Sequence, residues 1–382
     1  MRILHLNTER TWRGGEQQCL YLLQGLKEHN IACHLVCPPD SPLEERADRS
    51  GIPVFPISMR GETDLAAVFQ IRCLVRKGRY HIVHSHTSHA HTLAFLASAG
   101  IQTVRLVTRR VDFSIFRHSF LQLSGIKYRY MADFYIAISH EIKRVLVNDG
   151  LAPHRIFVVH SGVDLDRFAR ISSHHLKKEF SIGNEEKIVL NAAHLAGHKG
   201  QKYLIEAIPL VLREVPLARF FIVGEGELQS ELVHLTDYLG LKDKVVFTGF
   251  RKDVGAFYNL ADLFVMSSVK EGLGTAVLDA LALGLPVVAT RAGGIPESVF
   301  HDRTGRLVPP GDSAALAKEI IYMLKQPNEA RRMGSRGQII AREHFSIQAM
   351  IERNIDVYQQ ILGRRPGNCQ QAQEYGIPCS NT

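Results

Sequence analysis

Short runs of apolar residues alternate with longer amphipathic segments along the chain. Through the first part of the sequence, the apolar runs predict strands at residues 2–6, 32–37, 54–57, 82–85, 103–108, 134–138 and 157–160. Residues 15–28 carry leucines at helical spacing, which predicts a helix after the first strand. Short strands separated by helical segments predict a parallel sheet with helices on both faces.

The same alternation restarts after a polar stretch at residues 170–183. It predicts strands at 188–192, 219–223, 245–248, 263–266, 287–289 and 305–308, and helices at 203–215, 228–239, 254–260, 275–282 and 314–325. The predicted fold class is α/β, with two Rossmann-like doubly wound domains facing a central cleft. The predicted domains are 1–170 and 171–345, followed by a helix at 346–362 that packs back toward the first domain and a mobile tail at 363–382.

Composition narrows the class of protein. Of the 382 residues, 45% are hydrophobic and 22% are charged, which is typical of globular domains and excludes a disordered chain, collagen and a coiled-coil rod. The net charge of +8 is uneven: residues 1–172 hold 22 basic and 15 acidic side chains (+7), and residues 173–382 hold 24 and 23 (+1). A basic N-terminal half predicts an anionic partner, such as nucleic acid, a phosphorylated ligand or an acidic membrane face.

The cysteines and the N-terminus bear on the compartment. None of the six cysteines forms a C-x-x-C pair, and Cys33 and Cys37 lie within an apolar run, which favours reduced, buried thiols over a zinc site. The opening residues MRILHLN turn polar too soon for a signal peptide, and no apolar run is long enough to span a bilayer. These features predict a cytoplasmic protein and leave peripheral contact with the inner face of the plasma membrane open.

The most informative segment is residues 267–297, SSVKEGLGTAVLDALALGLPVVATRAGGIPE. Gly272 and Gly274 predict a tight turn before a helix that starts near Thr275, and the N–H groups of a helix start attract anions. Glu271 precedes the turn and Asp279 follows it; a carboxylate such as Asp279 can accept both hydroxyls of a ribose. The alternative is a structural turn flanked by two ordinary surface carboxylates.

Residues 192–200, AAHLAGHKG, directly follow another predicted strand. His194, His198 and Lys199 are three potentially cationic groups in this loop, and Lys199 could neutralise a diphosphate. The alternative is a solvated loop. A lysine near a helix start is unfavourably placed, which favours an anionic ligand at this loop.

Ten segments, taken in order, resemble the retaining glycosyltransferases of family 4, which have the GT-B fold. The resemblance covers about residues 1–362. Its segments are the pair Gly14 and Gly15, IVHSH, AISHEIKRVL, SGVDLDRF, HLAGHKG, FIVGEGEL, VVFTGFRKDV, EGLGTAVLDALALGLPVVAT, AGGIPE and TGRLVPPGD. No single segment is decisive, and the shared order makes the resemblance specific.

The resemblance implies that the second domain binds a nucleoside diphosphate sugar, UDP-linked in preference to GDP or ADP, with no metal and no other cofactor. Lys199 matches the family lysine that binds the diphosphate, and Glu271 matches the glutamate that contacts the hydroxyls of the donor sugar. Asp279 stands where the family usually has a ribose-binding glutamate, and His194 stands where it has an arginine. The other implied donor contacts are Gly272, Leu273, Gly274, Thr275 and Ala276 at the helix start, and Arg251 in GFRKDV against the base.

The first domain is implied to bind the acceptor. Gly14 and Gly15 match a loop that approaches the donor phosphates, and His86 matches a histidine near the reacting sugar. Glu16 is either an acceptor contact or an acid that stabilises the start of its helix. A metal site in HSHTSHAH is an alternative, because strand alternation places His84 and His86 on one face.

Two other motifs favour structural roles. Asp164 and Asp166 spell D-x-D, the metal signature of another glycosyltransferase fold, but here they match a linker segment of family 4. Residues 224–226, GEG, lack the third glycine of a dinucleotide-binding fingerprint.

These features predict a retaining glycosyltransferase that acts on a glycan or lipid-linked acceptor in cell-envelope lipopolysaccharide or surface polysaccharide synthesis. No carboxylate is placed as a nucleophile, so the resemblance favours front-face departure of the leaving phosphate, with His86, Lys199 and Glu271 as catalytic residues. One alternative is a nucleotide-sugar epimerase on the same fold. Another is a catalytically weakened regulatory homologue, because His194 and Asp279 depart from the family pattern.

The basic excess concentrates at residues 105–129, where one acid, Asp112, accompanies Arg105, Arg109, Arg110, Arg117, Lys127 and Arg129. Three interpretations compete: a patch for an anionic membrane surface, a pocket for a phosphorylated or acidic acceptor, and a solvated face over buried phenylalanines. No nucleic-acid-binding motif accompanies the charge, which argues against DNA or RNA. Flotation with anionic liposomes tests the first interpretation, and a complete lack of binding at every salt concentration would contradict it.

Overall fold

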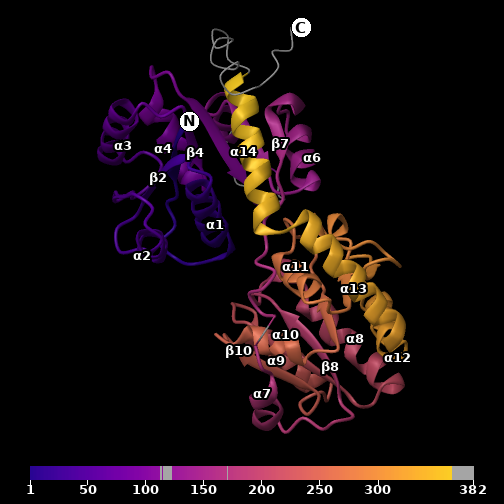
Figure 1. Cartoon of the computed structure of the whole chain (residues 1–382). Helices are drawn as coiled ribbons and strands as arrows, with labels where there is room; N and C mark the ends of the chain where they lie inside the picture. The colour runs from indigo at the N-terminus through magenta and orange to yellow at the C-terminus, as the bar shows by residue number, and fades with distance from the viewer. Residues whose placement is uncertain (112–113, 115–122, 170, 364–382) are drawn as a thin grey trace. The chain divides into compact units, whose positions relative to one another are not determined.

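The chain folds into two compact units. The computed structural model describes residues 1–111, 114, 123–169 and 171–363. The first unit comprises Met1–Gly162 together with the chain from Ile347 onward, and the second is Val163–Ser346 (Figure 1). The predicted tail at 363–382 lies outside the described residues except for Gly363.

The first unit is built on a seven-stranded parallel sheet in the order β3-β2-β1-β4-β5-β6-β7. Its strands are β1 Arg2–Leu6, β2 Ala32–Cys37, β3 Val54–Pro56, β4 Ile82–Ser85, β5 Val104–Arg109, β6 Phe134–Ala137 and β7 Ile156–Val158. Its helices are α1 Gly14–Glu28, α2 Pro42–Arg49, α3 Leu65–Gly78, α4 Ser88–Ser98, α5 Leu123–Tyr130, α6 His140–Asn148 and α14 Ile347–Gly363. Each strand predicted in this part of the chain is present.

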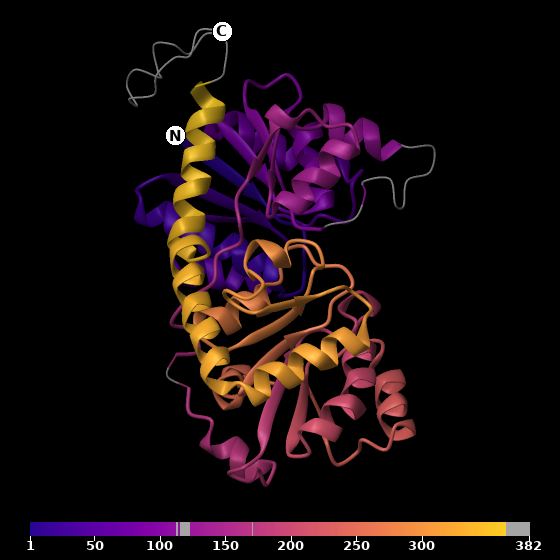
Figure 2. The same ribbon diagram turned by 90° about the vertical axis from the view of Figure 1, so that its right-hand side faces the viewer.

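Helices bury both faces of this sheet. One core contains residues of α1, α2 and α14 with β-strand side chains, and a second core lies beneath α3 and α4. Helix α14 packs against α1, where Gly25 lies directly against Ile351 because no side chain separates them. Figure 2 shows α14, in yellow, running along this unit. Side chains from the end of the sequence therefore complete a core that begins with Ile3 in β1.

The second unit has a six-stranded parallel sheet in the order β10-β9-β8-β11-β12-β13. The strands are β8 Lys187–Ala192, β9 Ala218–Val223, β10 Val245–Gly249, β11 Leu263–Met266, β12 Val287–Thr290 and β13 Arg306–Val308. The helices are α7 His174–Glu179, α8 Gln201–Glu214, α9 Gln229–Tyr238, α10 Val254–Leu260, α11 Thr275–Ala282, α12 Ser313–Lys325 and α13 Pro327–His344. The doubly wound α/β class predicted from the sequence is confirmed.

The units divide eight residues before the predicted boundary at 170. Residues 163–169 belong to the second unit because they pack on α10: the ring of Phe168 stacks on Tyr258 at 5.5 Å between centroids, and Asn259 donates to the Phe168 carbonyl at 2.7 Å. The polar stretch taken as a break contains the short helix α7. Within this segment the Asp164 carboxylate accepts from the Asp166 amide at 3.1 Å, so the D-x-D motif closes a local turn.

Across the described part of the chain, no helix combines the length and the apolar character needed to cross a membrane.

Candidate active site

In the second unit, the strand order reverses between β8 and β11, which are neighbours although β9 and β10 intervene in the sequence. Loops that leave such a switch point in opposite directions open a crevice at the carboxyl ends of the strands. Gly200 follows β8 with φ of +63°, and a Cβ there would overlap the carbonyl oxygen of Ser267 after β11. Glycine at position 200 therefore allows these two loops to meet.

Lys199 and Glu271 form an ion pair beyond the carboxyl ends of β8 and β11. The Lys199 Nζ lies 2.5 Å from Glu271 Oε2, and the two side chains are only 18% and 12% exposed. Ser268 Oγ donates to the same carboxylate oxygen at 3.2 Å. Such shielding from water strengthens a charge-assisted hydrogen bond. The structure thus brings together the two predicted donor-site residues, one from each loop.

The backbone of Glu271 is fixed by the turn after β12. The Gly294 amide donates to the Glu271 carbonyl at 3.2 Å, and Gly293 has φ of +50°. A Cβ at position 293 would overlap the Glu271 carbonyl oxygen. Sequence reasoning used AGGIPE only as a family segment and did not find this supporting role, although two adjacent glycines after a strand are a signal for a close backbone approach.

Helix α11 begins at Thr275, four residues after Glu271. Its N-cap is Gly274, with φ of +82°, and no side chain caps the helix start. The first N–H groups of a helix lack intrahelical partners, so this end offers uncapped donors and the positive end of the helix dipole. This segment consists of the predicted phosphate-cradle residues Gly272, Leu273, Gly274, Thr275 and Ala276. Phosphate binding by them stays a prediction.

Asp279 lies on the second turn of α11 and is half-buried. Burial raises the pKa of its carboxyl to about 7; the positive charge of Arg167 opposes this rise, and the negative charge of Asp164 adds to it. Tyr258 packs in the same region, and its hydroxyl donates to the Ala276 carbonyl at 3.1 Å. The carboxyl of Asp279 can therefore change its charge near neutral pH.

His194 and Arg251 have partners of their own. His194 is exposed, and its Nε2 lies 3.3 Å from Glu227 Oε2. The Arg251 guanidinium donates to Glu179 at 2.7 and 2.9 Å and to Asp253 at 2.8 and 2.9 Å, and these bonds raise the pKa of Arg251. The contact of Arg251 with a nucleotide base stays a prediction, as does the contact of His194 with a diphosphate.

The first unit has its own switch point between β1 and β4, and three buried histidines gather there. Register pairs His5 with His84 across the two strands, and His86 follows β4 on the same face as His84. His5 Nδ1 lies 3.0 Å from His86 Nε2, while His84 bonds Tyr358 at 2.9 Å and Thr108 at 2.7 Å. Burial lowers the pKa of all three imidazoles, which holds them neutral.

The sequence analysis identified His84 and His86 but missed His5. One nitrogen of each of the three rings lies within 4.8 Å of the others, so the cluster has a geometry that could hold a metal ion. His5 could have been found only from the adjacency of β1 and β4, since alternation within IVHSH gives no information about a neighbouring strand.

Helix α1 begins at Gly14 and Gly15, close to this cluster. The Glu16 carboxylate is buried and accepts from the Arg13 amide at 3.0 Å and from the Asn7 side chain at 3.4 Å. These bonds match the interpretation of Glu16 as an acid that stabilises its helix start. The side chain of Arg110 lies beside Gly15, and a Cβ added to Gly15 would be 3.7 Å from Arg110 Cδ.

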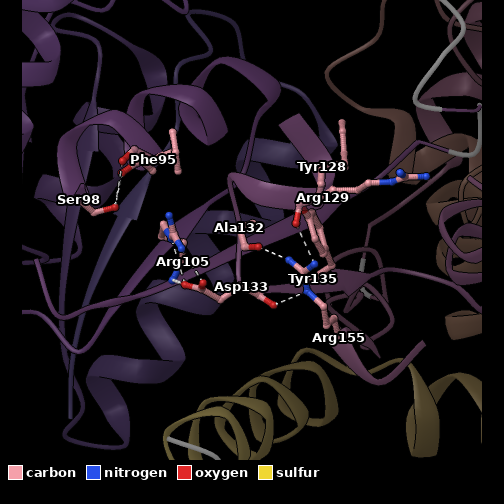
Figure 3. Close-up of polar contacts among 10 residues, drawn as sticks. Phe95, Ser98, Arg105, Tyr128, Arg129, Ala132, Asp133, Tyr135 and Arg155 are labelled. Atoms are coloured by element: carbon pink, nitrogen blue, oxygen red, sulfur yellow. Dashed lines mark hydrogen bonds and ion pairs between the residues drawn. The ribbon is translucent and has the colours of Figure 1, made fainter. Parts of the chain in front are cut away.

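Two of the six basic residues at 105–129, Arg105 and Lys127, form ion pairs within the described part of the first unit. Arg105 and Asp133 form an ion pair at 2.7 Å, drawn in Figure 3, and Lys127 pairs with Glu62 at 2.6 Å. Arg155 also reaches this region and donates to the carbonyl groups of Arg129 and Asp133, each at 2.9 Å. Residues 112–113 and 115–122 lie outside the described chain. Binding to an anionic membrane surface stays a prediction, with fewer unpaired cations than the sequence count implies.

Two family models match the chain. "Glycosyltransferase Family 4" matches residues 12–167, and "Glycosyl transferases group 1" matches residues 173–339. The matches cover the main parts of the two units in turn.

Relatives with assigned activities share much of the chain. The N-acetyl-alpha-D-glucosaminyl L-malate synthase of Bacillus anthracis is 27% identical over 78% of this chain and 80% of its own. The UDP-Gal:alpha-D-GlcNAc-diphosphoundecaprenol alpha-1,3-galactosyltransferase of Escherichia coli is 25% identical over 82% and 85%. The GDP-mannose-dependent alpha-(1-6)-phosphatidylinositol monomannoside mannosyltransferase of Mycolicibacterium smegmatis is 33% identical over 53% and 55%.

A solved structure shares the fold. Anabaena Alr3699/HepE, in complex with UDP and glucose, superposes with a TM-score of 0.81 at 22% identity, over 94% of this chain and all of its own.

Proposed function

The chain belongs to the family 4, group 1 glycosyltransferases, and we propose that it transfers a sugar from a UDP-sugar to a hydroxyl of a lipid-linked glycan acceptor. In this proposal the reaction retains the configuration of the anomeric carbon and needs no metal. The second unit binds the donor and the first unit binds the acceptor. The product would be an intermediate of cell-envelope polysaccharide synthesis.

The observation that carries the donor assignment is the Lys199–Glu271 pair beside an uncapped helix start. A nucleoside diphosphate sugar offers a diphosphate and sugar hydroxyls within one molecule. Lys199 and the N–H groups at Gly274 complement the diphosphate, and the Glu271 carboxylate accepts hydroxyl donors. In this proposal the bound diphosphate pairs with Lys199 and breaks the Lys199–Glu271 ion pair. The Glu271 carboxylate then accepts hydrogen bonds from the sugar hydroxyls.

Catalysis would rest on positioning and on stabilising the leaving group. The incoming hydroxyl oxygen bonds the anomeric carbon on the face from which the diphosphate oxygen leaves, and the hydroxyl proton passes to that phosphate. Lys199 and the α11 start stabilise the negative charge that develops on the diphosphate. Burial lowers the pKa of His86 and so favours the neutral imidazole, and its Nδ1 has no hydrogen-bond partner among the described residues; it can therefore make one hydrogen bond to the reacting sugar.

The names of the relatives support the substrate classes. Uridine nucleotides occur in the name of the E. coli relative and in the solved Anabaena complex, while the mycobacterial relative is named for GDP-mannose. Two of the named acceptors are lipid-linked, and the third is malate. UDP and a lipid-linked acceptor are therefore the first choices to test.

The direct test is release of nucleoside diphosphate from a panel of UDP-, GDP- and ADP-sugars, with and without undecaprenyl-diphosphate-linked sugars and free malate. We expect acceptor-dependent release of UDP and a product with retained anomeric configuration, read by NMR. Release from GDP-sugars alone would contradict the choice of base. Conversion of one UDP-sugar into another without UDP release would instead support an epimerase.

Asp279 gives the proposed nucleotide site a distinctive pH dependence. Because the pKa of its carboxyl is raised to about 7, raising the pH from 6 to 8 ionises it and should strengthen uridine binding by roughly fivefold, as charged acceptors form stronger hydrogen bonds. The native state also holds this proton more tightly than the unfolded chain. The free energy of unfolding should therefore fall as the pH rises from about 4 to about 7.

Asp279→Asn removes the titration and should flatten both profiles. Uridine is used because it carries no phosphate that titrates in this range. Calorimetry of uridine binding and urea unfolding at several pH values measure the two effects, and Glu231→Gln, an exposed change on α9, is the matched control. Equal pH profiles for wild type and Asp279→Asn would refute the assignment of the titration to Asp279.

A further inference from the structure

A largely buried guanidinium in the first unit lacks an anionic partner. Arg110 follows β5, and its buried Nε has no hydrogen-bond acceptor among the residues that the structure describes. Within the residues that the structure describes, its side chain makes no hydrogen bond or ion pair. Glu16 is near enough to act on the charge of Arg110, but the Glu16 oxygens accept from Arg13 and Asn7. Buried charges are normally paired, because desolvation costs several kcal/mol per ion.

The groups around Arg110 favour a negative ligand over a positive one. Arg110 and Thr108 line one small cavity, and the Thr108 hydroxyl bonds His84 Nε2 at 2.7 Å, which places the guanidinium beside the histidine cluster. Burial lowers the pKa of His84 and His86, and the charge of Arg110 lowers both further. His86 is 6% exposed, and its Nδ1 has no hydrogen-bond partner within the described part of the chain. A metal cation in the histidine cluster would be repelled by Arg110. An oxyanion would be attracted by the guanidinium and could accept a hydrogen bond from His86.

The beginning of α1 lies next to Arg110, because a Cβ added to Gly15 would be 3.7 Å from Arg110 Cδ. The Glu16 carboxylate lies in the first turn of α1 and accepts from the Arg13 amide, so it offsets part of the positive helix dipole. Attraction of an anion to this region therefore rests on Arg110 and not on the helix start.

We propose that Arg110, together with His86, binds an oxyanion of the acceptor, a phosphate or a carboxylate. This inference rests on the proposed function, in which the first unit binds the acceptor. The bound oxyanion forms the ion pair with Arg110 that no described residue of the protein provides. The acceptor in this proposal carries a negatively charged group close to the hydroxyl that receives the sugar. Arg110 makes the enzyme prefer such an acceptor to a neutral one of the same shape.

The proposal separates a binding role of Arg110 from a structural one. If Arg110 stabilised the fold, Arg110→Met would lower the melting temperature. Because the guanidinium is unpaired, replacing it with an apolar side chain of similar length removes a desolvation cost. We therefore expect the Arg110→Met variant to melt at the same temperature as wild type or higher, and to lose the anion site.

The test titrates inorganic phosphate, and separately malonate, into protein saturated with UDP, which keeps the proposed donor site occupied. We expect saturable binding to wild type and a weakening of about 10- to 100-fold in Arg110→Met, from the loss of hydrogen bonds to a charged group. Arg129→Met, an exposed arginine of the same basic stretch, should bind as wild type does.

Three outcomes would overturn the proposal. These are phosphate affinity unchanged in Arg110→Met, phosphate binding to wild type that UDP abolishes, and a lowered melting temperature of Arg110→Met with anion binding intact. The affinity for UDP is measured on its own in the same experiment. If UDP failed to bind wild type, the proposed function would fail, whatever the phosphate titration gave.

Discussion

Replacing Lys199 with alanine should lower kcat by about 10²- to 10³-fold, the usual effect of removing one contact to a developing oxyanion. The ammonium lies at the switch point of the second sheet, 2.5 Å from Glu271 and shielded from water, where its charge acts strongly on a departing diphosphate. The substitution also leaves the Glu271 carboxylate with Ser268 in place of a cation. Both changes weaken the stabilisation of the leaving group.

Steady-state kinetics with saturating acceptor measure this effect, and UDP affinity is determined in parallel. Lys202→Ala is the matched control, because Lys202 lies three residues further along the chain, on α8, is exposed, and lies 3.9 Å from Glu206. Its kcat should stay near that of wild type. A Lys199→Ala enzyme with kcat within twofold of wild type would show that the diphosphate is stabilised elsewhere.

The alternation of apolar runs and amphipathic segments was enough to predict the strands of both sheets, because these strands are short, buried and bounded by polar turns. Helix α13 was not predicted. Its sequence contains Gly334 and Gly337, which read as helix breakers, yet both serve packing: a Cβ at Gly334 would overlap the Gly284 carbonyl, and one at Gly337 would meet Leu281 on α11. Glycines that permit close helix contact carry no apolar signal in a sequence pattern.

The sequence predicted most of the individual residues of the candidate sites, but not which of them contact one another. The loops that carry Lys199 and Glu271 could be placed at strand ends from sequence, but their contact across 72 positions depends on β8 lying next to β11. The same holds for His5, which meets His84 because β1 pairs with β4. Strand order is a property of the whole sheet, so a local pattern cannot supply it.

Gly293→Ala should reduce kcat/KM by about 100-fold without a change in any residue proposed to touch substrate. A Cβ at position 293 would overlap the carbonyl oxygen of Glu271, and φ of +50° is strained for alanine. The turn after β12 must therefore move, and it takes with it the hydrogen bond from Gly294 to Glu271. A displacement of about 1 Å in a substrate-positioning group can cost about 100-fold in rate.

Gly197→Ala provides the comparison that isolates this effect. Gly197 lies in the loop that carries Lys199, its φ is not positive, and a Cβ there would meet no atom within 4 Å. We expect Gly197→Ala to keep near-wild-type kcat/KM. Gly293→Ala should also lose about 1–3 kcal/mol of stability, the range for a strained backbone position. A Gly293→Ala enzyme with a lower free energy of unfolding and unchanged kcat/KM would show that the position of the Glu271 carboxylate does not limit the reaction. The role of Glu271 as a donor-sugar contact would then have to be abandoned.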